Sequence, residues 1–283
     1  MSECTIASSE IERLEISDDI PDKLIYKALP VGEFIRVLKL QPGETDQDIR
    51  CSLEIVGIED SKATYEAISY VWGDAKNTVN IWCNGLRVPI TASLADALRN
   101  FRRTSKPRVL WADALCINQK DDREKGHQVE RMGEVYTNAK RTLVWLDRDN
   151  QDIAEDAFAL MCETNTYLAD SFFQADQNFY KMRPFAKPYP ICMEKERWRG
   201  VAQLFEFPWF RRVWTVQEAA IAKECRLYWG SVSIDIADVL EMTSVKPFEM
   251  SSGKSTILWG GTYQSTSITI RTGQNDGSNP ALA

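Results

Sequence analysis

The sequence predicts an α/β domain whose parallel sheet is flanked by helices, with an added N-terminal part rich in β-hairpins. Two observations predict the parallel sheet. Residues 108–113 and 143–146 are short apolar runs, typical of strands buried on both faces, and segments with helical periodicity alternate with them. A third observation predicts a hairpin, because Asn84-Gly85 separates two alternating runs and tolerates the positive φ of a two-residue turn.

The N-terminal part alternates between apolar and polar side chains with the period of a strand. Residues 34–40 and 49–56 are separated by a polar turn, which predicts an antiparallel pair, and residues 65–72 form an apolar run that stops at Gly73. We therefore expect strands at 34–40, 49–56, 65–72, 79–83, 86–90, 108–113 and 143–146, and a hairpin over 227–234.

Helices are predicted where apolar residues recur three or four positions apart. Leu94, Leu98 and Phe101 show this spacing, and either Thr91 or Ser93 can cap the helix that they define. Further helices are expected over 121–139, 152–168, 194–205 and 208–222.

Charge and composition divide the chain into three parts. The first 60 residues hold 14 acidic and 6 basic side chains and the remainder hold 27 and 28, so the net charge of −7 belongs to the N-terminal segment. We expect residues 1–30 to form a mobile acidic arm and residues 31–245 to form the domain. Residues 246–283 are rich in Ser, Thr and Gly, and we expect them to form a poorly ordered tail. The nearly neutral domain lacks the basic face of a nucleic-acid binder and a polybasic patch for membranes.

Composition argues against other classes as well. Seven widely separated cysteines without a Cys-x-x-Cys pair, and a single His, lead us to expect no disulfide framework, no metal site and no cofactor. This cysteine usage fits a reduced, cytoplasmic protein, and no apolar run reaches the roughly 18 residues of a membrane span. His127 lies on a polar helix face and Cys116 in an apolar segment, which favours a surface and a core role over a nucleophilic pair.

Polar residues gather where a predicted strand ends. Asp113 ends an apolar strand, and ligands of open α/β sheets bind in the crevice beyond the strand ends. Asn118 and Gln119 continue this edge, and Glu124 and Gln128 are one turn apart on the next helix. A carboxylate and amides that face one crevice can hold a sugar or a nucleotide. The alternative is that Asp113 caps a turn and Asn118 bonds to the backbone.

The helix expected from Pro208 carries a carboxylate beside its apolar stripe. Trp214 belongs to that stripe, and Glu218 lies one turn later at its edge. Burial of an unpaired carboxylate is costly, so Glu218 needs a partner or a function. Arg211, two turns earlier, is a candidate partner, and a structural ion pair is the alternative to a functional role.

Five motifs follow one another along the chain: Tyr-Glu-Ala-Ile-Ser-Tyr-Val-Trp-Gly (65–73), Leu-Trp-Ala-Asp-Ala-Leu-Cys-Ile-Asn-Gln (110–119), His-Gln-Val-Glu-Arg-Met (127–132) with Tyr136, Val-Trp-Leu (144–146) and Arg-Arg-Val-Trp-Thr-Val-Gln-Glu (211–218). Together they resemble the fungal heterokaryon incompatibility (HET) domain, over about Phe34 to Ile236 with core motifs in 65–218. The resemblance implies a fungal protein of non-self recognition, a form of innate immunity that ends in programmed cell death. Ala112 departs from the family, which often has Ile there.

Two shorter fragments are similar to Toll/interleukin-1 receptor (TIR) domains. Ile68-Ser69-Tyr70, with Asp74 beyond it, looks like their first-strand motif. Trp214, followed four residues later by Glu218, resembles their Trp-Cys-x-x-Glu helix, with Thr215 in place of the Cys. This resemblance implies a TIR- or flavodoxin-like fold. From the TIR enzymes that hydrolyse NAD, it also implies that Glu218 is catalytic.

Two functions follow from these resemblances. In a hydrolase of NAD or a related nucleotide, Glu218 would stabilise the oxocarbenium-like state, Tyr70 and Trp72 would stack on nicotinamide, and the ribose or diphosphate would lie against Asp113, Asn118 and Gln119. The alternative is a non-catalytic signalling module that acts by self-association and contact with an unidentified protein trigger. A dehydrogenase has no support, because the chain lacks a glycine-rich phosphate motif.

Overall fold

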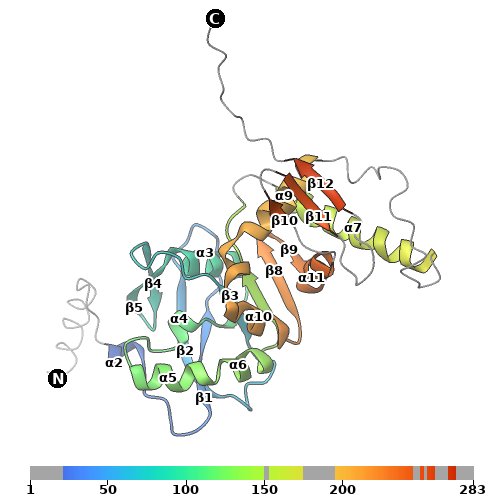
Figure 1. Ribbon diagram of the computed structural model, residues 1–283. Helices are drawn as coiled ribbons and strands as arrows, with labels where there is room; N and C mark the ends of the chain where they lie inside the picture. Colours follow the sequence, from blue (N-terminus) through green and yellow to red (C-terminus); the bar gives the residue numbers. More distant parts are fainter. Residues whose placement is uncertain are drawn as a thin grey trace, which may run out of the picture. The chain divides into compact units, whose positions relative to one another are not determined.

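The computed structural model describes residues 22–149, 153–174, 195–244, 249–251, 254–258 and 267–271. The chain divides into two compact units, one with residues up to 150 and 207–233, the other with 151–206 and 234–283. Figure 1 labels the helices and strands of both units.

The first unit is a sheet flanked by short helices (Figure 1). Its strands are β1 (Phe34–Leu40), β2 (Arg50–Gly57), β3 (Glu66–Tyr70), β4 (Thr78–Cys83), β5 (Leu86–Thr91), β6 (Arg108–Trp111), β7 (Thr142–Trp145) and β8 (Cys225–Trp229), and β9 (Val232–Asp235) completes the sheet. Its helices are α2 (Asp22–Ile25), α3 (Ala92–Phe101), α4 (Asp113–Cys116), α5 (Asp122–Glu130), α6 (Met132–Asn138), the 3₁₀ helix η1 (Pro208–Arg211) and α10 (Val213–Ala220).

The nine strands lie in the order β5-β4-β2-β1-β6-β3-β7-β8-β9. Four adjacent strands form a parallel segment, β6-β3-β7-β8, because β3 pairs in parallel with β6 and β7, and β7 pairs in parallel with β8. On the other side β1 is antiparallel to both β2 and β6, β2 is parallel to β4, and β4 is antiparallel to β5. The sheet is therefore mixed.

The predicted α/β class is confirmed, but the predicted TIR- or flavodoxin-like parallel sheet is not. Antiparallel pairing is extensive, and the hairpin-rich N-terminal part is not an addition, since β1, β2, β4 and β5 belong to the same sheet. The physical reason is that alternation along a strand indicates which side chains face the core, whereas the neighbour of a strand is decided by contacts far away in sequence.

The turn and the helix cap that the sequence predicted are present in the structure. Asn84 and Gly85 have φ of 53° and 82°, and they join the antiparallel strands β4 and β5 as predicted. The Thr91 hydroxyl caps α3 by accepting a hydrogen bond from the Leu94 amide at 3.4 Å. All five residues of β3 are buried, so the carboxyl end of this strand is held rigidly by the core.

Two predicted helices are interrupted. The helix expected over 121–139 divides into α5 and α6 at Arg131, and the helix expected over 208–222 divides into η1 and α10 at Arg212, whose backbone is extended. The second break coincides with a long-range contact, because Arg212 Nη1 donates a hydrogen bond to the Tyr70 carbonyl. Residues after Arg212 therefore do not keep the register of a single helix from Pro208.

The segment before β1 is attached to the first unit. Ile25 is buried, the Asn84 side chain donates to its carbonyl at 3.1 Å, and Arg36 donates to the Lys27 carbonyl at 2.6 Å. These contacts fall within the arm expected over 1–30, of which residues 1–21 lie outside the described residues, so the mobile arm stays a prediction.

The second unit contains α7 (Ala154–Gln174), α9 (Lys195–Glu206) and α11 (Ile236–Ser244). Arg197 pairs with Glu163 at 2.7 Å and links α9 to α7, and Asn165 donates to the Asp238 carbonyl at 2.9 Å. The strands β10 (Glu249–Ser251), β11 (Lys254–Leu258) and β12 (Ser267–Arg271) form an antiparallel sheet within the segment predicted as a poorly ordered tail. The rest of that segment lies outside the described residues, so its predicted disorder stays a prediction.

Two properties of the described residues bear on function. None of their helices has the length and apolar composition that a bilayer crossing requires. In the same part of the chain, no group of three or more His, Cys, Asp or Glu side chains is arranged to hold a metal ion.

Candidate functional site

A cleft of about 440 Å³ opens in the first unit beyond the carboxyl ends of β3 and β6. These two strands are parallel, and such strand ends are where open α/β sheets bind ligands. The turn after β3, the start of α4, the break between α5 and α6, and α10 contribute its walls. It is lined by Val71, Trp72, Gly73, Asp113, Val129, Met132, Arg212, Trp214 and Glu218.

Glu218 is the most buried carboxylate of the cleft, with only 4% of its surface exposed. The Ser69 hydroxyl at the end of β3 donates a hydrogen bond to its Oε2. Burial raises the pKa of Glu218 above its ordinary value, and the negative charge of Asp113 adds to this effect, while the Ser69 hydroxyl and the Arg212 cation oppose it. The predicted burial of Glu218 is met, and Ser69 is its hydrogen-bond donor.

Asp113 is the second carboxylate of the cleft. The Trp72 indole donates to its Oδ2 and the Ala114 amide to its Oδ1, both at 2.8 Å. Burial raises the pKa of Asp113, although the hydrogen bond from Trp72 acts in the opposite direction. Since Asp113 also begins α4, both the ligand interpretation and the turn-capping interpretation of this residue remain compatible with its position.

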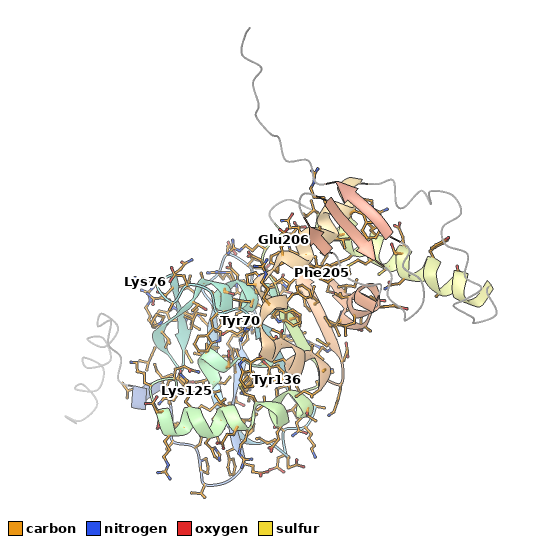
Figure 2. The ribbon with its side chains drawn as sticks, viewed as in Figure 1. Tyr70, Lys76, Lys125, Tyr136, Phe205 and Glu206 are labelled. Atoms are coloured by element: carbon orange, nitrogen blue, oxygen red, sulfur yellow. The ribbon has the colours of Figure 1, made fainter. Side chains whose placement is uncertain are left out.

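Tyr70 and Tyr136 are buried tyrosines of the first unit (Figure 2). The Tyr136 hydroxyl donates to the Ile68 carbonyl at 3.2 Å. The Tyr70 hydroxyl makes no hydrogen bond of good geometry with a described residue. Burial is the main cause that raises the pKa of Tyr70, and the nearby Asp113 carboxylate raises it further. Tyr70 is thus buried, and its ring is not exposed for the stacking that the sequence suggested.

The cation near Glu218 is Arg212, and the proposed partner Arg211 is wrong. Arg212 lines the cleft, donates to the Tyr70 carbonyl and lowers the pKa of both carboxyl groups. Arg211 is exposed at the end of η1. The spacing of two turns between Arg211 and Glu218 assumed one continuous helix, and the extended backbone at Arg212 removes that register.

The same break moves Trp214 out of the core. The sequence placed Trp214 in a buried stripe, but 59% of its surface is exposed, and it lines the cleft. Trp72 lines the cleft with 37% of its surface exposed. Two indole faces are therefore available to a ligand at this site, one from the turn after β3 and one from α10.

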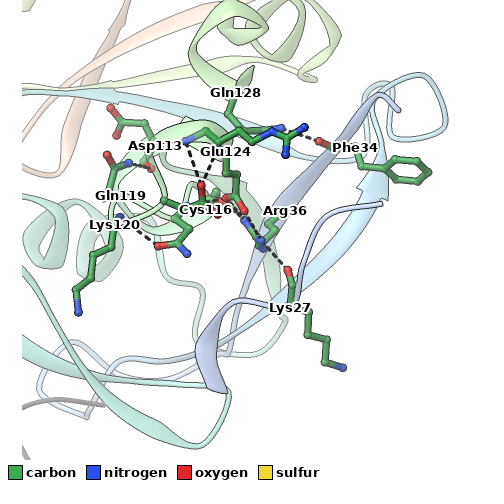
Figure 3. Close-up of polar contacts among 12 residues, drawn as sticks. Lys27, Phe34, Arg36, Asp113, Cys116, Gln119, Lys120, Glu124 and Gln128 are labelled. Atoms are coloured by element: carbon green, nitrogen blue, oxygen red, sulfur yellow. Dashed lines mark hydrogen bonds and ion pairs between the residues drawn. The ribbon is translucent and has the colours of Figure 1, made fainter. Parts of the chain in front are cut away.

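Three other predicted ligand-binding residues are engaged with the backbone. Asp74 accepts a hydrogen bond from the Lys76 amide at 2.9 Å, and Asn118 accepts one from the Lys120 amide at 3.2 Å. The Gln119 amide donates to the Asp113 carbonyl at 2.9 Å (Figure 3). These contacts shape the turns around the cleft, as the structural alternative for Asn118 anticipated, and none of the three residues lines the cleft.

Glu124 and Gln128 lie on α5 and do not line the cleft. Glu124 accepts two hydrogen bonds from Arg36, at 2.5 and 2.9 Å, and one from the Asn118 amide at 2.9 Å (Figure 3). Gln128 is buried and donates to the Phe34 carbonyl at 2.9 Å. The structure does not bring these two residues to the cleft. Arg36 on β1 binds the Glu124 carboxylate, and the Phe34 carbonyl binds the Gln128 amide.

The remaining nucleophile candidate has a structural position. Cys116 is buried, accepts a hydrogen bond from the Ala112 amide, and burial raises its pKa to about 12, so the thiol stays protonated. His127 is exposed and accepts a hydrogen bond from Arg131 at 3.3 Å. The surface position expected for His127 is confirmed.

Five residues that line the cleft were not predicted as site residues: Val71, Gly73, Val129, Met132 and Arg212. Arg212 was hidden by the assumption of a continuous helix, and the other four residues carry no polar or charged side chain that indicates a site. Adjacent arginines at 211 and 212 offered a signal for a cation here, but only the fold decides which of the two faces the cleft.

Comparison with known proteins gives one family and one relative. A family described as heterokaryon incompatibility protein (HET) matches residues 65–218. The heterokaryon incompatibility protein 6, OR allele, of Neurospora crassa is 28% identical over 221 residues, which cover 67% of this chain and 32% of that protein. The chain thus spans about a third of the length of this curated relative. No solved structure gives a significant match.

Proposed function

The chain belongs to the heterokaryon incompatibility (HET) family, which matches more than half of it, and from this premise we propose that it acts in the cytoplasm as an effector of fungal incompatibility. Its similarity to a Neurospora crassa protein named for heterokaryon incompatibility supports this role. The expected outcome of such an effector is programmed cell death after fusion of incompatible cells.

We propose further that the cleft hydrolyses NAD or a related nucleotide, with Glu218 as the catalytic residue. One observation carries this proposal: Glu218 is 4% exposed, lines the cleft, and is hydrogen-bonded by the neutral Ser69 hydroxyl rather than by a guanidinium. A carboxylate in this setting keeps its negative charge available for a cationic transition state.

The reaction follows from the groups at the cleft. Hydrolysis breaks the bond between ribose C1′ and the ring nitrogen, and the bonding electrons leave with nicotinamide. The ionised Glu218 stabilises the oxocarbenium-like ribose, water adds to C1′, and a proton is released to solvent. Trp72 and Trp214 offer faces on which a cationic or aromatic ring can stack, and Arg212 offers a charge for a phosphate group.

Part of the fold supports the remote TIR likeness on which this proposal draws. The parallel strands β6-β3-β7-β8 follow the order second, first, third, fourth along the chain. Flavodoxin-like sheets share this order and bind ligands beyond its strand ends.

Nicotinamide release by the purified, concentrated chain tests the proposal. Wild type should release nicotinamide from NAD, Glu218→Gln should release at least about 100-fold less, and Glu130→Gln, a change of an exposed glutamate on α5, should match wild type. Circular dichroism checks that all three proteins are folded. Equal release by wild type and folded Glu218→Gln would remove the enzymatic proposal.

A signalling module without catalysis is the second candidate function. Three exposed apolar side chains, Trp72, Val129 and Trp214, lie at one cleft, and an apolar cluster of this kind can take a protein partner or another copy of the chain. In that case the fraction of fungal cells that die when they produce Glu218→Gln should be proportional to the amount of folded variant. Killing that disappears while the folded amount is unchanged would exclude the module.

A further inference from the structure

Glu218 is held by a chain of two hydrogen bonds from neutral groups. The Trp209 indole nitrogen, on η1, donates to Ser69 Oγ at 2.8 Å, and Ser69 Oγ, on β3, donates to Glu218 Oε2. All three side chains are buried, with no more than 4% of their surface exposed. Three separate elements, β3, η1 and α10, therefore meet at one carboxylate.

The direction of this chain is fixed by the chemistry of indole. The indole N–H can donate but has no lone pair to accept a hydrogen bond. Ser69 Oγ must therefore accept from Trp209, and its single proton is directed to Glu218. A hydroxyl that donates to a carboxylate favours the ionised form of that carboxylate. The Arg212 cation and the Tyr136 hydroxyl also favour the ionised form of Glu218, and the Asp113 carboxylate opposes it.

Ser69 differs from the other hydroxyls in the described part of the chain. Serine and threonine commonly donate to nearby backbone carbonyls. Among the described residues, Ser61, Thr64, Thr164, Thr166 and Thr215 donate to carbonyls three or four residues away. Ser93 and Thr142 donate to more distant backbone carbonyls, those of Val71 and Glu218. Ser69 instead donates across 149 residues of sequence to a buried carboxylate, so its contact is specific to Glu218.

The break of the helix at Arg212 supports this arrangement. An uninterrupted helix from Pro208 would keep Trp209 and Glu218 in one helical register, whereas the 3₁₀ turn and the extended Arg212 allow both residues to approach Ser69. The Arg212 hydrogen bond to the Tyr70 carbonyl fixes the break beside the end of β3.

We propose that Ser69 is the positioning residue of Glu218: it orients the carboxylate toward the cleft and favours its ionised form, while Trp209 fixes the direction of the Ser69 hydroxyl. The catalytic consequence rests on the proposed hydrolysis, but the hydrogen-bond chain does not. Removal of the hydroxyl therefore changes the ionisation of Glu218 whether or not the cleft hydrolyses a nucleotide.

The experiment follows Glu218 directly, by ¹³C NMR titration of side-chain carboxyl groups in the full chain, with its signal assigned through Glu218→Gln. Ser69→Ala should raise the pKa of Glu218 by about one pH unit, and Trp209→Phe, which keeps the ring but removes the N–H, should raise it by less. Ser93→Ala is the matched control, because its hydroxyl donates to the Val71 carbonyl at 2.7 Å beside the cleft, and it should leave the titration unchanged.

Nicotinamide release provides the second measurement. If the cleft is catalytic, the acidic limb of the pH–rate profile should move to higher pH in Ser69→Ala by about one pH unit, and release on that limb should fall by up to about 10-fold. An unchanged Glu218 titration in folded Ser69→Ala would overturn the positioning role, and Trp209→Phe decides the matter if Ser69→Ala does not fold. Absence of release by wild type, with a shifted titration in Ser69→Ala, would overturn the proposed hydrolysis alone.

Discussion

Glu124 and Glu218 are both substantially buried glutamates of the first unit, and they differ in what holds them. Glu124 accepts two hydrogen bonds from the Arg36 guanidinium and one from the Asn118 amide, and it does not line the cleft. Glu218 accepts a hydrogen bond from the neutral Ser69 and borders a space of about 440 Å³. A carboxylate saturated by a cation therefore serves the fold, whereas one held by a neutral donor at a cleft stays available to a ligand.

The largest loss of stability is expected when the cation that pairs with Glu124 is removed. Arg36→Met leaves the buried Glu124 carboxylate unpaired and removes the donors to the Lys27 and Cys116 carbonyls, so the free energy of unfolding should fall by about 3–5 kcal/mol. Lys39→Met, on the same strand, removes only an exposed pair with Glu54 and should cost less than about 1 kcal/mol. Urea unfolding of both variants measures the contrast, and a similar small loss in each would contradict the structural role of Arg36.

Substitution of each glutamate by glutamine should affect stability differently at the two positions. Glu124→Gln should lower the free energy of unfolding at pH 7 by about 2–3 kcal/mol, because Arg36 loses the charged acceptor of its hydrogen bonds. Glu218→Gln should be at least as stable as wild type, because the amide has no charge to bury. Urea unfolding at pH 7 checks both, and the reverse order of stability would show that Glu218 is the structural carboxylate.

The free energy of unfolding should change with pH in a direction set by whether folding raises or lowers the pKa of each buried carboxyl group. The pKa of Glu218 is raised above 4.5 in the folded chain, chiefly by burial, so its contribution to stability is full below pH 4.5 and is lost as the pH rises through the folded pKa. Glu218→Gln lacks this loss, so its free energy of unfolding relative to wild type should increase over that interval. A difference between the two proteins that stays flat with pH would contradict the raised pKa.

Glu66 should behave in the opposite way. Burial acts to raise its pKa, but the hydrogen bond and charge of Arg108 prevail and lower it below 4.5. Its contribution to stability is therefore present above pH 4.5 and is lost as the pH falls through the folded pKa. The free energy of unfolding of Glu66→Gln relative to wild type should improve on acidification, whereas that of Glu218→Gln should improve toward neutral pH.

The smallest expected effect on stability concerns the rim of the cleft. Trp214 is 59% exposed, so Trp214→Ala should change the free energy of unfolding by no more than about 0.5 kcal/mol. Its affinity for NAD, measured by calorimetry, should nevertheless fall, because an indole face is lost from the cleft. Leu24→Ala, which removes a 48% exposed side chain that does not line the cleft, should change neither quantity.

The sequence alone predicted those features that depend on neighbours in the chain. The positive φ of Asn84-Gly85 and the cap by Thr91 are local, and both are met. Local chemistry is sufficient for features of this kind.

What could not be predicted depends on contacts between distant residues. Arg36 lies 88 residues before Glu124, and no spacing along one helix indicates that it draws Glu124 away from Asp113. Arg212 reaches the Tyr70 carbonyl across 142 residues, and this contact accompanies the helix break that exposes Trp214 and replaces Arg211. The antiparallel part of the sheet was missed for the same reason, since the neighbours of a strand are chosen by the whole fold.

The most direct test of the central claim compares nicotinamide release by Glu218→Gln and Glu124→Gln, each normalised to its folded fraction. Glu124→Gln should release nicotinamide from NAD at nearly the wild-type rate for each folded molecule, whereas Glu218→Gln should lose at least about 100-fold despite its full stability. Equal rates for the two folded variants would contradict the claim that Glu218 is the working carboxylate of the cleft.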